Sequence, residues 1–285
     1  FDNYLPLNTM HSAALSILAD VSDAVYDKSL ISTGKYNIWN KTMTYHHNFK
    51  TSTRSDLSSN GKTIVFGVDA IPLLLGDGIN LVPTVFLGSS RENLSYDSSN
   101  SIGSGFIGGL KLCWNIEDYG NLIFLCSYGN IGNGSRDYYA RTHLFSTGIC
   151  CNGALLLEEN VALMPQIQLD YMSIIPENIQ IKYASVNHKN FHNLKTAAGV
   201  SLRFTNDNLA ASVGAKFVKR FGGNLSGTCC GKEIPSFEKN SSSHLELNAK
   251  ISGEINDAMH IDLTVGKTCD GRKGCSAGLT LSVAL

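Results

Sequence analysis

Charged side chains are sparse in this chain, and many of them fall on one face of segments that alternate in polarity. In the segment 244–251 the odd positions are apolar, whereas the even positions include Glu246 and Lys250. A period of two puts alternate side chains on opposite faces of a β-strand, so these charges would share one surface. On an enclosed surface they would need water or ion-pair partners. The residues that we expect on this inward surface are Asp69, Lys111, Asp170, Lys195, Arg203, Lys216, Arg220, Glu246, Lys250, Glu254 and Asp262.

Catalytic and metal-binding motifs are missing from the sequence. Neither G-x-S-x-G nor H-E-x-x-H occurs, and the cysteines form no C-x-x-C pair. His46 and His47 are adjacent but have no further ligand residues nearby. The glycine-rich stretches 103–105 and 132–134 lack the lysine of a phosphate-binding loop. We therefore expect no enzymatic activity, no metal and no cofactor.

The cysteines are even in number, which allows disulfides in an oxidising compartment. Cys269 and Cys275 flank a short loop at 270–274, so a disulfide across the last hairpin is possible. Cys150 and Cys151 are neighbours and would point to opposite faces of a strand, which favours packing over a bond. The eight cysteines are Cys113, Cys126, Cys150, Cys151, Cys229, Cys230, Cys269 and Cys275.

One segment near the N-terminus has helical periodicity. Apolar residues recur at three- and four-residue steps over 9–30, with Thr9 as a possible N-cap and Gly34 after the end. About twenty residues at 1.5 Å each span roughly 30 Å, the thickness of a bilayer's hydrocarbon core. Three aspartates exclude contact with lipid, so the helix would lie against protein. Its polar face comprises Ser12, Ser16, Asp20, Asp23 and Asp27.

After Gly34 the chain alternates with a period of two in twelve segments. Several are near ten residues long, which is long for a soluble sheet and ordinary for a tilted membrane strand. Short turns alternate with the long polar stretches 46–61, 89–103, 129–141, 173–192 and 221–243, as in an outer-membrane barrel; the short final loop at 270–274 breaks this rhythm. The predicted strands are 36–45, 62–72, 79–88, 104–115, 120–128, 142–154, 161–172, 194–204, 209–217, 244–251, 259–266 and 276–285.

Composition agrees with a membrane barrel. Of 285 residues only 16% are charged and the formal net charge is −1, which argues against a nucleic-acid partner. No run of about 18 apolar residues could form a membrane helix. We predict an all-β membrane protein: a twelve-stranded antiparallel transmembrane barrel over 35–285, preceded by a linker at 1–34 whose helix lies in the pore. Because the chain starts at Phe1 without a signal-peptide pattern, we expect it to be a fragment or a processed product.

This layout resembles the translocator domain of Gram-negative autotransporters, the type V secretion family. The likeness rests on the pore-length helix, the pair Ile38-Trp39 that opens the first strand, the run 67–69 (Gly-Val-Asp) in the second, and Pro165 with Tyr171 in the middle strand. These short motifs gain their weight together, from their order and spacing along the whole chain.

The resemblance implies a function in the bacterial outer membrane. The barrel would insert with help from the barrel-assembly machinery and periplasmic chaperones, and its own N-terminal passenger, a virulence factor in many members, would cross to the cell surface. The helix then plugs the pore, and some members are cut there. The barrel would act as a monomer in contact with lipid. The C-terminal assembly signal would comprise Leu281, Val283 and Leu285.

Three features depart from that family. Its members usually end in an aromatic residue, where this chain has Leu285. Aromatic residues make up only 9% of the chain, which predicts thin interfacial girdles. Eight cysteines are also unusual in such barrels.

Three other functions stay open at this point. The chain could be a stand-alone outer-membrane porin or adhesin whose long loops bind host surfaces. It could be a soluble β-sandwich that binds a partner, because alternation alone does not distinguish lipid from a protein core. It could also be a protease that cuts its own linker with acidic residues such as Glu246 and Asp262. The inward charges themselves could merely keep a pore hydrated, or they could hold the helix.

Overall fold

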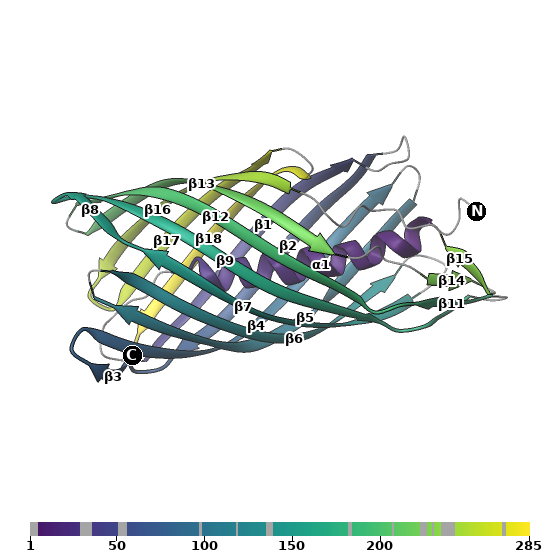
Figure 1. Ribbon diagram of the computed structural model, residues 1–285, viewed down its shortest axis with the longest axis horizontal. Coiled ribbons are helices and arrows are strands. Elements are labelled where there is room, and N and C mark those ends of the chain that lie inside the picture. The colour runs from purple at the N-terminus through teal and green to yellow at the C-terminus, as the bar shows by residue number, and fades with distance from the viewer. Residues whose placement is uncertain are drawn as a thin grey trace.

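The computed structural model is a long barrel with a helix in its interior (Figure 1). It describes residues 5–28, 36–50, 56–96, 99–117, 119–134, 139–181, 184–206, 208–222, 227–229, 231–234, 243–269 and 272–285. Helix α1 covers Leu5–Tyr26. The described part of the chain contains no helix that is long and apolar enough to cross a membrane.

Twelve antiparallel strands form the closed wall. Each pairs with its sequence neighbour in the wall, and β1 closes the ring by pairing with β18, from Asn37 opposite Ala284 to Phe49 opposite Arg272. The wall strands are β1 (Asn37–Lys50), β2 (Asp56–Asp69), β4 (Ile79–Tyr96), β5 (Ser99–Ile116), β6 (Gly120–Gly134), β7 (Tyr139–Gly153), β9 (Val161–Pro176), β12 (Phe191–Asn206), β13 (Leu209–Gly222), β16 (Ser243–Asn256), β17 (Met259–Cys269) and β18 (Arg272–Ala284). The predicted twelve-stranded barrel with an internal helix is confirmed.

The two ends of the barrel differ. The C-terminus and the tight turns lie at one end, here called the turn end, where β3 (Leu73–Gly76) pairs with β4 and β8 (Leu155–Glu158) pairs with β9 (Figure 1). The turn that follows β3 needs Gly78, whose φ of 73° lies in the left-handed region. The opposite end, the loop end, carries a separate four-stranded sheet of β10 (Ile179–Ile181), β11 (Ala184–His188), β14 (Gly227–Cys229) and β15 (Lys232–Ile234).

The wall strands extend well beyond the predicted segments. The stretch 46–61, expected as a loop, is mostly strand, because β1 continues to Lys50 and β2 begins at Asp56. Likewise β4 runs to Tyr96 and β6 to Gly134. The alternation of apolar and polar residues stops where a strand has polar side chains on both faces. The backbone hydrogen bonds to the neighbouring strands continue past that point. The sequence prediction therefore made these strands too short at the loop end.

The helix also lies four residues earlier than predicted, at Leu5–Tyr26 instead of 9–30. Pro6 is tolerated within the first turn, where a backbone N–H has no intrahelical acceptor. At the other end the last helical hydrogen bond joins Asp27 N to Asp23 O at 2.9 Å, and Lys28 then pairs with Asp69 of the wall. The helix therefore ends four residues before its predicted end, just ahead of this wall contact.

Side chains alternate strictly between the lumen and the outer surface. On β2, Thr63 and Val65 are buried inside whereas Phe66 is 58% exposed outside. Large apolar residues face outward on every strand of the wall, among them Val85, Phe106, Ile167, Val213 and Leu263. The buried core instead lies between the helix and the inner wall.

Candidate functional site: the helix in the barrel lumen

One side of α1 packs against an apolar part of the wall. The helix makes its main contacts with β2, β4, β5, β6, β7 and β9. Helix residues such as Leu18 and Val21 are buried in one cluster with wall residues such as Phe86 and Ile107. Gly88 leaves space on β4, since a Cβ built there would lie 3.3 Å from Val21 Cγ1. Each large side chain buried in this way contributes about 1.5–3 kcal/mol, so apolar packing holds this side of the helix.

The other side of α1 faces a cavity of about 890 Å³. Asp20 and Asp23 of the helix and Asp27 just after it line the cavity, and most residues of the opposite wall, from β12, β13, β16, β17 and β18, are polar or small. This cavity is large enough for many water molecules and has polar groups to bind them. The helix therefore occupies the lumen asymmetrically, packed against the wall on one side and facing a polar cavity on the other.

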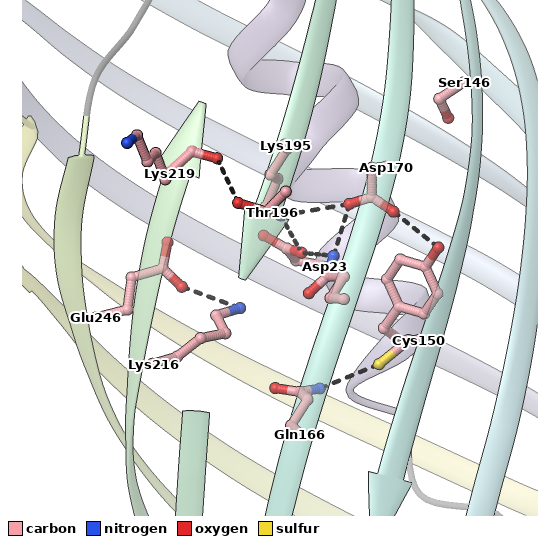
Figure 2. A network of polar contacts seen from close by, with 12 residues as sticks. Asp23, Ser146, Cys150, Gln166, Asp170, Lys195, Thr196, Lys216, Lys219 and Glu246 are labelled. Atoms are coloured by element: carbon pink, nitrogen blue, oxygen red, sulfur yellow. Dashed lines mark hydrogen bonds and ion pairs between the residues drawn. The ribbon is translucent and has the colours of Figure 1, made fainter. Parts of the chain in front are cut away.

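Asp23 is the centre of a charged network that joins the helix to two strands (Figure 2). Lys195 of β12 approaches its Oδ1 atom to 2.6 Å, and Gln168 of β9 donates to the same oxygen at 3.0 Å. Asp170 accepts hydrogen bonds from the Tyr26 hydroxyl at 2.9 Å and from Gln168 at 2.7 Å. Lys195 also lies 3.7 Å from Asp170, so one buried ammonium serves two carboxylates.

Asp69 of β2 forms a second network where the chain leaves the helix. Its Oδ2 atom pairs with Lys28 at 2.5 Å and accepts a hydrogen bond from Asn37 at 2.9 Å. Its Oδ1 atom accepts hydrogen bonds from Trp39 Nε1 at 2.9 Å and Thr84 Oγ1 at 2.8 Å. A buried carboxylate with this many donors is well compensated for its lost hydration. Asp69 thus connects the end of the helix to β1, β2 and β4.

The Gly-Val-Asp run of β2 acquires a physical explanation from this network. Gly67 stands opposite Trp39 in the β1–β2 register. A Cβ at Gly67 would lie 2.2 Å from Trp39 Cζ2, so only glycine admits the indole ring at this place. Asp69, two residues later on the same face, then receives the indole N–H. Trp39 is fully buried, and its position requires both residues.

Asp27 is contacted more weakly, from β1 and β16. Lys41 Nζ lies 3.8 Å from its carboxylate and 3.4 Å from the carbonyl oxygen of Ala24. Lys250 donates to the Asp27 carbonyl oxygen at 3.3 Å and pairs with Asp262 at 2.9 Å. Two lysines near the last carbonyls of a helix interact favourably with its dipole.

The two acidic residues considered for autoproteolysis are paired with cations of the wall. Glu246 lies 3.0 Å from Lys216 and 2.9 Å from His244. Asp262 lies 2.8 Å from His260 as well as close to Lys250. These contacts stabilise ionised carboxylates that serve as ion-pair partners. Within the described ranges, no group of three or more His, Cys, Asp or Glu residues could hold a metal ion.

The structure brings most of the predicted inward residues to the lumen. Asp69, Lys111, Asp170, Lys195, Lys216 and Asp262 are buried there. Arg203, Glu246 and Lys250 line the cavity, and Arg220 shares the inward side of β13. On the helix, Ser16 is buried and donates to Asp20 at 3.5 Å, whereas the side chain of Ser12 lies outside the described residues. In the predicted C-terminal assembly signal, the side chains of Leu281 and Leu285 are exposed, and Val283 pairs in register with Ile38 of β1.

Several residues that hold the helix were not among the predicted site residues. Tyr26, Lys28, Lys41 and Gln168 all contact a network carboxylate or the end of the helix. Lys41 and Gln168 do carry a signal, since both lie at inward positions of an alternating strand. Tyr26 and Lys28 have no such signal, because they do not lie on an alternating strand and their partners are distant in sequence.

The predicted disulfide between Cys269 and Cys275 is wrong. Both cysteines are free, and the register places Cys275 opposite Lys267 on one side and His46 on the other. The two thiols are therefore diagonal neighbours on the outer face, where Cα atoms lie about 7–8 Å apart, beyond the usual reach of a disulfide. Cys113 and Cys150 are buried and behave as small core residues.

Comparison with known proteins supports the architecture. The chain matches no protein-family model and no curated protein sequence. Among solved structures it is similar to the translocator domain of the autotransporter NalP from Neisseria meningitidis, with a TM-score of 0.70 and 15% identity over 100% of this chain and 98% of that one. It is similar to the transport unit of the autotransporter AIDA-I from Escherichia coli, with a TM-score of 0.73 and 12% identity over 98% and 99%.

A third similar structure is the β domain of the Bordetella autotransporter BrkA, with a TM-score of 0.69 and 11% identity over 88% of this chain and 100% of that one. At these identities the likeness concerns the fold. It covers the wall and, for NalP, the full length of the chain including the helix. This chain therefore has the fold of an autotransporter translocator domain.

Proposed function

We propose that this chain is the outer-membrane translocator of an autotransporter, which secretes its own N-terminal passenger to the bacterial cell surface. The observation that carries the proposal is the helix itself. It runs through the barrel from the loop end toward the turn end, where Asp69 connects it to β1 (Figure 1). A segment joined to the start of this helix would lie at the loop end, which is the cell-surface end in this proposal.

The outer surface supports placement in a membrane. Exposed apolar side chains such as Phe66, Val85, Phe106 and Ile167 encircle the wall, and an apolar surface of this extent is not stable in water. A closed barrel leaves no unpaired strand edge in the hydrocarbon region. The two longest connections between wall strands, from β9 to β12 and from β13 to β16, both lie at the loop end, as the long external loops of outer-membrane barrels do.

The lumen supports a role in transport without catalysis. Inside it Lys28, Lys195, Lys216 and Lys250 form ion pairs with carboxylates, so these charges are used to hold the wall and the helix together. With the helix in place the remaining cavity is lined on one side by that helix, so the plugged barrel differs from an open porin. Membrane insertion would use the barrel-assembly machinery and periplasmic chaperones, with the C-terminal strand as the signal.

Surface display of a reporter tests the proposal. A signal peptide and a small, protease-sensitive reporter domain are joined ahead of residue 1, and the fusion is expressed in a Gram-negative host. We expect external protease to remove the reporter from intact cells while the barrel migrates faster in unheated than in heated gel samples. The same fusion with β18 deleted, so that the barrel cannot close, is the control.

The outcome that contradicts the proposal is a folded, heat-modifiable barrel in the outer-membrane fraction whose reporter stays protected inside the cell. That result would favour a stand-alone barrel. Failure to find the chain in the membrane fraction would instead remove both membrane functions.

A further inference from the structure

Two basic side chains stand directly opposite each other on the outer surface of the barrel. Lys62 of β2 pairs in register with Arg91 of β4. Both are exposed, and their positions alternate with the inward residues Thr63 and Ser90, whose hydroxyls lie 2.8 Å apart in the lumen. Among the described residues neither Lys62 nor Arg91 has an ion-pair partner. Directly opposite side chains have Cβ atoms about 4.5–5.5 Å apart, so these charges repel each other.

The neighbouring groups do not neutralise this pair. On the flanking strands Lys62 stands opposite Thr44 and Arg91 stands opposite Ser104, both of which are uncharged. The nearest carboxylate in the register, that of Glu92, is fully buried on the lumen side, where it accepts a hydrogen bond from Ser59. The outer surface thus carries two positive charges whose repulsion a bound anion would relieve.

The pair lies at the border of the apolar outer surface. The next outward pair toward the turn end is Ile64 with Ser89, and the pair after that is Phe66 with Leu87. Two residues of a strand advance by about 6.8 Å, so Lys62 stands one such step from Ile64, and the pair stands two steps from Phe66 and Leu87. In a bilayer this border is the level of the lipid headgroups.

The same sign recurs around the barrel at the loop end. On the wall strands, every outward charged residue whose side chain is described is basic. These residues are Lys62, Arg91, Arg141, Lys219, Lys267 and Lys273. At the turn end the described charged residues of the turns are acidic, namely Asp77, Glu117, Glu158, Glu159 and Asp257. The described acidic residues at the loop end, Glu177 beside Arg141 and Glu233, belong to connections beyond the wall strands, so the outer wall itself is basic there and would be attracted by anionic lipid headgroups.

We propose that Lys62 and Arg91 form a binding site for a phosphorylated glycolipid of the lipid A type in the outer leaflet. This inference rests on the proposed function, which places the loop end at the cell surface. A phosphomonoester carries a charge between −1.5 and −2, which two adjacent cations balance. Arg91 would bind two phosphate oxygens with its planar guanidinium group, and Lys62 would act as a point charge, while the acyl chains lie along Phe66 and Leu87.

The test measures lipid A binding to the refolded 285-residue chain in nonionic detergent by native mass spectrometry. We expect the double variant Lys62→Gln/Arg91→Gln to bind bisphosphorylated lipid A at least about tenfold more weakly than the unaltered chain, because hydrogen bonds between charged groups are lost. The matched control is Lys189→Gln/Lys232→Gln, which removes the same charge from exposed positions at the loop end and should bind like the unaltered chain. Each single variant should lose part of the affinity, which preserves the test if the double variant does not fold.

Three results would overturn the site: equal binding by the double variant, an equal loss in the control, or equal binding of lipid A from which both phosphates have been removed. Inorganic phosphate that competes at the same concentration as lipid A would overturn the lipid assignment, since the acyl chains would then contribute nothing. Heat-modifiable migration and insertion into liposomes are followed in parallel. A chain that fails these two assays contradicts the proposed function, whereas a chain that passes them and ignores lipid A contradicts this site alone.

Discussion

The two halves of the inner wall contact the same helix in different ways. The half from β2 to β9 is apolar and touches the helix with side chains such as Ile107 and Leu125, so close packing holds that side. The half from β12 to β18 is polar: Lys195 reaches the helix at Asp23, and the rest faces the helix across the cavity with lysines such as Lys216 and Lys250 on its surface. Apolar packing is non-directional and stabilises the helix inside the lumen. Ion pairs with side chains at fixed positions on the strands set how deep the helix lies and how it is rotated about its axis.

The difference also explains how a helix with three aspartates can lie in a barrel. Its apolar stripe needs a dry partner, and its acidic stripe needs water or cations. A uniformly apolar lumen would bury the carboxylates without compensation. A uniformly polar lumen would give the helix no packing energy. The asymmetric wall satisfies both stripes at once.

The largest effect should follow from placing a charge on the dry side. Val21→Asp would bury a carboxylate between the helix and β4 with no cation in contact, at a cost on the order of 4 kcal/mol. We expect the helix to leave the apolar wall, which trypsin cleavage after Lys28 in the detergent-folded barrel would report. Asp20→Asn, on the cavity side, is the control and should keep the site protected. Equal protection of Lys28 in Val21→Asp and in the unaltered chain would contradict the idea that packing holds the helix.

The next largest effect should come from Asp69, which connects the end of the helix to β1, β2 and β4. Asp69→Ala would leave the buried Lys28 ammonium and the Trp39 indole without their acceptor, at a cost of roughly 3 kcal/mol. The midpoint of thermal unfolding in detergent should fall, and Trp39 fluorescence should shift as its surroundings loosen. Asp69→Asn keeps an acceptor for the indole and should lose less. An unchanged midpoint in the alanine variant would show that this network contributes little.

A smaller effect is expected where the polar half contacts the helix. Asp23→Asn removes one charge from the ion pair with Lys195, which keeps Asp170 at 3.7 Å as a second partner. We expect a loss of about 1.5 kcal/mol, in the range of hydrogen bonds to charged groups. High salt should reduce this difference only slightly, because buried pairs are weakly screened. If Asp23→Asn proved as damaging as Val21→Asp, the polar half would hold the helix as firmly as the apolar half.

The smallest effect on the barrel should come from mild acid, which acts outside both halves. In the loop-end sheet, burial lowers the pKa of His188 to about 4, below the ordinary value of 6.5. The folded sheet therefore binds fewer protons than the unfolded segment, so its stability is complete above pH 6.5 and falls, by at most about 3 kcal/mol, as the pH drops toward 4. Hydrogen-exchange protection of β11 and β14 should fall between pH 7 and pH 5 while that of the wall strands persists. His188→Asn should abolish this dependence; if it does not, another group is responsible.

Much of the fold could be predicted from local pattern. The period of two along twelve segments predicts strands, the helical repeat near the N-terminus predicts one helix, and the rhythm of short and long connections predicts the two ends. The inward residues also follow from alternation, because parity along a strand decides the face. Strand ends could not be placed, since backbone hydrogen bonding continues past the apolar pattern, as β1 and β2 show.

The sequence by itself determined which side chains share a face, since this depends on neighbours along the chain. Only the tertiary structure decided which faces meet. Asp23 and Lys195 are 172 residues apart, and closure of the ring brings them to 2.6 Å. Cys269 and Cys275 are six residues apart, yet the hairpin register keeps them from bonding. Contact depends on register and closure, and these are properties of the whole sheet.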